Sequence, residues 1–196
     1  LAALRCLTLQ RMRRLSEAAE ACNDLVTKGY TDENVLAPLT MCLNALNRDG
    51  EATTLWANAY QAKPGDASLG RRVCAAHARQ QDWPHVRSVA AALYKSTKDV
   101  GYLRRFAAAA LVEATATPAP PTKLLTLKLG DKMLERCIDE SGGYQRCSAE
   151  DVELLASLRE ARGDFPGAAH CIRQARDGLA SQTEGDFVRR PTERNL

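Results

Sequence analysis

The segment EATTLWANAYQAKPGD, residues 51–66, carries a helical pattern that recurs along the chain. Ala52, Trp56 and Ala59 stand at i, i+4 and i+7, which places their side chains on one face of a helix. A shift of about 34 residues in either direction meets the same classes of residue, and two further copies follow at longer steps. We expect these positions in the core of a repeat protein: Ala18, Cys22, Leu25, Ala52, Trp56, Ala59, Val86, Ala90, Leu93, Leu134, Ala168 and Ile172.

A period of about 34 residues with two helices per copy is typical of the tetratricopeptide repeat. In the second copy, Leu36, Leu39 and Leu43 give the first helix its apolar face. Pro64 ends the second helix, because proline cannot donate a hydrogen bond to the preceding turn. Such copies stack in one dimension. The sequence therefore predicts an all-α chain, a right-handed α-α superhelix of the tetratricopeptide-repeat-like solenoid type with about five helical hairpins.

The repeats predict a single solenoid domain over residues 1–180, followed by a polar C-terminal tail over 181–196. A proline-rich insertion near 115–123, TATPAPPTK, separates the two helices of the fourth copy, which we expect at about 102–114 and 124–139. The chain opens in a helix already under way. We therefore expect that the sequence begins within a longer protein.

Composition narrows the class of protein. Apolar residues make up 45% and charged residues 26%, and no apolar run approaches the roughly 20 residues of a membrane-spanning helix. The net charge of +3 is too small to indicate DNA binding. The seven cysteines include no C-x-x-C pair, and the three histidines are not placed beside them as a zinc site needs. We expect reduced thiols in a cytoplasmic protein, with no metal, no membrane and no DNA partner.

Sequence motifs for catalysis are missing. The chain has no phosphate-binding loop, no H-E-x-x-H and no G-x-S-x-G. His170 and Cys171 are adjacent, but neighbours on a helix point to different sides. Ser148 is expected to cap a helix with Asp151, where a carboxylate favours the positive end of the helix dipole. The acyl-transfer motif [RQ]-x-x-G-x-[GA] is also missing, so we expect a protein that is not an enzyme, with no catalytic residue and no cofactor of its own.

The first helices of tetratricopeptide repeats usually line a concave groove that binds partners. In this chain the corresponding positions are small, apolar and locally basic. The predicted partner-binding residues are Met41, Asn44, Arg71, Arg79 and Arg105. The alternative to partner binding, for each arginine, is an ordinary solvent-exposed position.

Five stretches carry a resemblance beyond the generic repeat: LRCLTLQRMRRLSEAAEACNDL, TDENVLAPLTMCLNALNR, AALYKSTKDVGYLRRFAAAALVEA, LLTLKLGDKMLERCIDE and AEDVELLASLREARGDFPGAAHCIR. In order and spacing they resemble the auxiliary, non-catalytic subunit of the N-terminal acetyltransferase B (NatB) complex, over most of residues 1–175. The segment ALYKSTKDVGYLRRF is the most specific. The chain departs from the family just after it, where an aromatic-rich run is reduced to Tyr102 and Phe106.

The resemblance implies a scaffold that wraps a separate catalytic N-terminal acetyltransferase subunit and helps anchor it near the ribosome's exit tunnel. The complex would acetylate nascent chains whose initiator methionine precedes Asp, Glu, Asn or Gln. Acetyl coenzyme A would be bound by the catalytic partner. The chain would be cytoplasmic, with the ribosome as a second candidate partner.

Two alternatives stay open. The first is a generic tetratricopeptide-repeat adaptor, for example one that grips a chaperone's C-terminal carboxylate. That clamp needs Lys and Asn where this chain has Ala3, Leu7 and Pro38, and only Arg72 fits it. The second is that Arg71, Arg79 and Arg105 form a basic surface that contacts ribosomal RNA. This alternative is compatible with the scaffold hypothesis.

Overall fold

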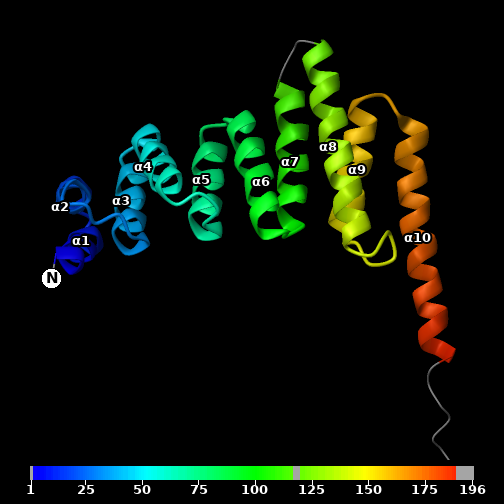
Figure 1. Cartoon of the computed structure of the whole chain (residues 1–196), viewed down its shortest axis with the longest axis horizontal. Coiled ribbons are helices and arrows are strands. Elements are labelled where there is room, and N and C mark those ends of the chain that lie inside the picture. The colour runs from blue at the N-terminus through cyan, green and yellow to red at the C-terminus, as the bar shows by residue number, and fades with distance from the viewer. Residues whose placement is uncertain (1, 117–119, 189–196) are drawn as a thin grey trace, which may run out of the picture. The chain divides into compact units, whose positions relative to one another are not determined.

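The structure, a computed structural model, describes residues 2–116 and 120–188. Those residues form ten helices and no strand (Figure 1). The helices are α1 (Ala2–Arg11), α2 (Leu15–Thr27), α3 (Glu33–Ala45), α4 (Asp49–Ala62), α5 (Ala67–Arg79), α6 (Trp83–Thr97), α7 (Gly101–Ala116), α8 (Pro120–Glu140), α9 (Ala149–Ala161) and α10 (Phe165–Val188). Each odd-numbered helix packs against the next even-numbered one, which confirms the predicted all-helical class and the five hairpins.

The chain divides into two compact units, Leu1–Thr97 and Lys98–Leu196. The first unit holds α1 to α6, and the second holds α7 to α10. Within the first unit, α2 packs on α3 and α4 packs on α5, so consecutive hairpins are stacked. Within the second unit, α9 contacts both α7 and α8.

Backbone geometry repeats with the sequence in the first unit. The turns between the paired helices use Arg13, Asn47 and Gln81, each with a φ of 58° in the left-handed region. Successive members of this set are separated by one repeat period, so the same tight turn closes each of the three hairpins. Asn tolerates this conformation better than Arg or Gln does. The turn is therefore imposed by packing of the hairpin rather than by local preference alone.

Side-chain caps fix where several helices begin. Asp32 accepts a hydrogen bond from the backbone of Asn34 at 2.9 Å, and Asp66 accepts one from Ser68 at 2.9 Å. Ser148 and Asp151 form the reciprocal capping box at the start of α9. Each cap satisfies a backbone donor that the first helical turn leaves unpaired.

The core of the first unit forms where consecutive hairpins meet. Trp56 of α4 is 2% exposed and packs with Leu36 of α3 and with Leu69 and Val73 of α5. Ten of the twelve positions expected in the core are buried: Ala18, Cys22, Ala52, Trp56, Ala59, Val86, Ala90, Leu93, Leu134 and Ala168. Leu25 is half-buried and packs at the edge of the first cluster.

The prediction that Ile172 lies in the core is wrong, because this residue is 52% exposed. In the earlier copies, the equivalent positions Cys22 and Trp56 are covered by the first helix of the next hairpin. The described residues contain no hairpin after α10, so none of them covers Ile172 in this way. Cys171, which is fully buried, contributes the inward side chain on this turn of α10.

Helices α7 and α8 extend into the predicted insertion from both sides. Helix α7 ends at Ala116 and α8 begins at Pro120, a first-turn position where the missing N–H of proline costs nothing. Residues 117–119 of the insertion lie outside the described residues. Helix α10 continues to Val188, into the segment assigned to the polar tail, and 189–196 lie outside the described residues. The domain boundary at residue 180 stays a prediction.

Candidate functional site

A hollow of about 270 Å³ lies in the first unit between α3 and α5. We call it the α3–α5 groove. Its lining residues are Ala37, Thr40, Met41, Asn44, Asp49, Thr53, Trp56, Arg72, Ala75, Ala76 and Arg79. The structure thus brings together three of the predicted partner-binding residues, Met41, Asn44 and Arg79. Helix α4 contributes Thr53 and Trp56, which are both buried.

Two ion pairs cross this region. Arg72 of α5 donates to Glu33 of α3, with Nη2 2.7 Å from Oε1, and Ser68 donates to the same carboxylate at 3.1 Å. Arg79 of α5 donates to Asp49 of α4, with Nη2 3.0 Å from Oδ1. The hydrogen bond from Arg72 is the main reason that the pKa of Glu33 lies below its ordinary value. Both arginines therefore face carboxylates, and the groove is less basic than the sequence indicates.

Trp56 and Arg72 both line the α3–α5 groove and contact each other. The guanidinium carbon of Arg72 lies 5.9 Å from the centroid of the Trp56 ring, within the range of a cation–π contact. This contact and the pair with Glu33 both favour the orientation of Arg72 seen here. The result is a charged side chain placed over the ring of Trp56.

Small and adaptable side chains leave room beside that floor. Ala37, Ala75 and Ala76 contribute only methyl groups to the lining. Met41 is 60% exposed, and its sulfur lies 3.7 Å from Nε2 of Gln10 on α1. Methionine adapts its shape to a partner more easily than branched side chains do. The groove can accept one or two apolar side chains of a bound segment, with polar groups available at its edges.

Arg71 is exposed but does not line the α3–α5 groove, whereas Arg72 does. The helical phase explains the difference, because Arg72, Ala76 and Arg79 are separated by four and three residues and share one face of α5. That spacing could have identified Arg72 from sequence. Arg105 is exposed on α7 of the second unit, which is described separately.

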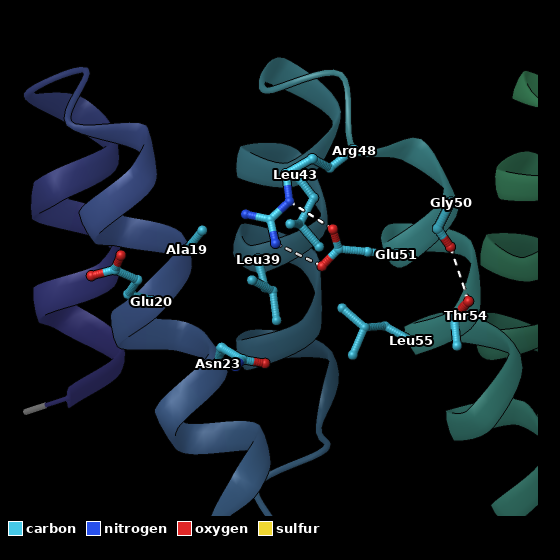
Figure 2. A pocket seen from close by; sticks show the side chains of 10 residues that line it. All are labelled: Ala19, Glu20, Asn23, Leu39, Leu43, Arg48, Gly50, Glu51, Thr54 and Leu55. Atoms are coloured by element: carbon cyan, nitrogen blue, oxygen red, sulfur yellow. Dashed lines mark hydrogen bonds and ion pairs between the residues drawn. The ribbon is translucent and has the colours of Figure 1, made fainter.

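A second hollow of about 370 Å³ lies in the first unit between α2 and α4, over α3 (Figure 2). We call it the α2–α4 hollow; its lining residues are Ala19, Glu20, Asn23, Leu39, Leu43, Arg48, Gly50, Glu51, Thr54 and Leu55. Arg48 and Glu51 are joined at its edge by two hydrogen bonds of 2.7 Å each. Its floor consists of leucines that belong to the core. The sequence did not single out this hollow.

Two further features bear on catalysis and metals. His170 is exposed while Cys171 is fully buried, so the two adjacent side chains do point to different sides. His77, Asp82 and His85 lie together in the first unit, with one potential ligand atom from each within 4.8 Å of the others. This group, which we call the histidine cluster, was missed because the search for zinc ligands paired histidine only with cysteine.

Among the helices formed by the described residues, none combines the length and the apolar character that a bilayer crossing requires. This observation agrees with the apolar pattern of the sequence.

Stacked hairpins with a lined groove define this protein as a tetratricopeptide-repeat-like scaffold. Solved structures of MamA share the fold. A MamA fragment from Desulfovibrio magneticus RS-1 matches with a TM-score of 0.60 at 14% identity, over 93% of this chain and 95% of that one. Residues 1–173 match the family described as Psidin, N-terminal TPR repeats region, and the chain belongs to this family.

Two relatives named as NatB subunits are similar in sequence to most of this chain. The chain is 28% identical over 154 residues to the "N-terminal acetyltransferase B complex subunit NAA25 homolog" of Caenorhabditis elegans. It is 25% identical over 172 residues to the human "N-alpha-acetyltransferase 25, NatB auxiliary subunit". These matches cover 78% and 87% of this chain, but only 16% and 17% of the relatives' lengths. The chain therefore corresponds to a small part of those proteins.

Proposed function

We propose that this chain is a non-catalytic scaffold segment of a NatB-type N-terminal acetyltransferase complex. The observation that carries the proposal is the family match over residues 1–173, together with relatives that are named as NatB auxiliary subunits. A fold of stacked hairpins suits this role, because it presents an extended surface to a partner. The catalytic subunit supplies the active site and binds acetyl coenzyme A.

Within this segment, the α3–α5 groove is the surface that receives the catalytic subunit. Its alanine-lined space, the exposed Met41 and the fixed Arg72 suit a segment that presents apolar side chains beside a polar or acidic group. Because Arg72 already contacts Glu33 and the ring of Trp56, binding has a smaller entropy cost for ordering this side chain.

Co-expression of the chain with the NatB catalytic subunit of the same organism tests the proposal. A stable complex on size-exclusion chromatography is expected. Ala75→Glu places a carboxylate in the α3–α5 groove on an exposed helical position and should weaken the complex about tenfold or more, as a hot-spot change does. Gln61→Glu is the matched control, because Gln61 is exposed on α4 and lines neither the groove nor the α2–α4 hollow.

The outcomes separate the two levels of the proposal. A complex that forms equally well with Ala75→Glu would place the contact elsewhere and leave the scaffold function standing. If the chain forms no complex with the catalytic subunit but binds a chaperone's C-terminal peptide, that result would favour the generic adaptor. In the scaffold reading the protein works in the cytoplasm beside the ribosome, on nascent chains.

A further inference from the structure

The histidine cluster occupies a position where the repeat pattern changes. In the first two hairpins, the turn carries an Arg–Glu ion pair at i and i+3, Arg14 with Glu17 and Arg48 with Glu51. One repeat period further along the chain, the third hairpin carries Asp82 and His85 at the equivalent places.

A second substitution accompanies the first. The residue five positions before Arg48 is the buried Leu43, and the residue five positions before Arg14 is the half-buried Leu9. In the third hairpin this position is His77, whose side chain is 13% exposed. The third hairpin has thus replaced an apolar side chain and a salt bridge with two imidazoles and a carboxylate.

Both imidazoles contact the carboxylate of Asp82. Nδ1 of His77 lies 3.0 Å from Oδ2 of Asp82, and Nδ1 of His85 lies 2.8 Å from Oδ1 of the same residue. The backbone fixes two of the three residues, because the N–H of Asp82 donates to the carbonyl of His77 at 3.0 Å. His85 follows in the first turn of α6.

We propose that His77, Asp82 and His85 form a Zn²⁺ site that closes the turn between α5 and α6. Imidazole nitrogen and carboxylate oxygen are ordinary ligands of this ion. Tetrahedral coordination with bonds of about 2.0–2.1 Å separates neighbouring ligand atoms by about 3.3 Å. The separations from each Nδ1 to the carboxylate, 3.0 and 2.8 Å, are a few tenths of an ångström shorter, so these atoms move slightly apart when the ion enters between them. Each imidazole stays neutral by carrying its proton on Nε2, and water completes the shell.

One adjustment is needed. The imidazole rings of His77 and His85 are stacked, with centroids 4.8 Å apart and an angle of 7° between planes. A nitrogen binds a metal in the plane of its ring, so one ring must turn before both converge on one ion. His85 is the ring that turns, because its side chain is 66% exposed whereas His77 is held in the packed end of α5.

Cysteine thiols are the alternative ligands for zinc in this chain, and their burial disfavours them. Six of the seven cysteines are buried, and Cys147 is half-buried. Burial raises the pKa of Cys147 and disfavours the thiolate that a metal requires. Cobalt as a spectroscopic probe reports the difference, because a thiolate ligand adds a charge-transfer band that nitrogen and oxygen ligands lack.

The test is competition of chelator-stripped protein with a chromophoric chelator for ZnCl₂. One ion per chain is expected, and zinc at about one hundred times its dissociation constant should multiply the folding equilibrium constant about one hundredfold. His85→Ala and Asp82→Asn should each weaken binding about tenfold or more; Asn can still accept a hydrogen bond from the backbone N–H of His85, as Asp82 does. His170→Ala and Cys147→Ser are controls that should retain full affinity.

Binding that survives His85→Ala unchanged would overturn the proposal, as would binding lost in Cys147→Ser or a cobalt spectrum with a thiolate band. Failure of the wild-type chain to take up one equivalent would overturn it directly. None of these outcomes bears on complex formation with the acetyltransferase, which is measured separately.

Discussion

Arg104 of α7 holds the buried carboxylate of Asp151 at the start of α9, with Nη2 of Arg104 2.7 Å from Oδ2 of Asp151. Its Nε donates to the other carboxylate oxygen, so the contact is bidentate. Asp151 is 1% exposed, and Ser148 donates to it at 2.8 Å. This carboxylate both caps α9 and ties α9 to α7 within the second unit.

Acid should destabilise the second unit through Asp151. Burial favours the neutral acid, but hydrogen bonds from Arg104 and Ser148 outweigh burial and hold the pKa of Asp151 below its ordinary value of 3.8. A depressed pKa contributes stability that is present above pH 3.8 and is lost as the pH falls through the folded-state pKa. Urea unfolding at a series of pH values between pH 6 and pH 2.5 spans this change and measures the loss of stability.

Asp151→Asn is the variant that isolates this term. It keeps a capping side chain but removes the charge, so we expect a loss of roughly 1–3 kcal/mol near neutral pH. The loss should shrink as the pH falls. An Asn variant with the same acid dependence as the wild type would show that other carboxylates govern acid unfolding. Glu150→Gln is the matched control, since Glu150 is the exposed neighbour in the same helical turn.

Gly130→Ala should destabilise the second unit despite the better helix propensity of alanine. A Cβ at position 130 would lie 2.9 Å from Cβ of Ala110 and 3.0 Å from Cδ2 of Leu158. Overpacking of this kind costs about 1–3 kcal/mol, against a gain of about 1 kcal/mol from propensity. Gly50→Ala is the control, because the nearest atom to a Cβ there is 3.7 Å away. It should leave stability unchanged or raise it, and chemical denaturation compares the two.

Sequence periodicity was sufficient to predict the hairpins and ten buried core positions, because those ten positions, from Ala18 to Ala168, follow one helical spacing. It could not predict exposure at Ile172, since burial there depends on a following hairpin. It also could not predict the Arg72–Glu33 and Arg79–Asp49 pairs, which join residues 39 and 30 positions apart. The charge of a groove depends on such pairs.

Trp56 and Ile172 should respond very differently to truncation, although the repeat pattern places them at equivalent positions. Trp56→Ala should cost roughly 3–5 kcal/mol, because it empties a site between α3, α4 and α5. Ile172→Ser should change stability by no more than about 0.5 kcal/mol, because the side chain is mostly in solvent. Equal losses on chemical denaturation would mean that Ile172 is covered in the folded protein in solution.

Arg71 and Arg79 should separate a ribosome contact from the groove. Arg79 already faces the carboxylate of Asp49, whereas Arg71 makes no ion pair among the described residues. A phosphate contact contributes about one unit to the slope of log affinity against log salt concentration. We expect Arg71→Ala to reduce that slope for ribosome association by about one unit and Arg79→Ala to leave it unchanged. Cosedimentation with ribosomes across a salt series measures both slopes. A slope that falls only for Arg79→Ala would instead assign the α3–α5 groove to RNA.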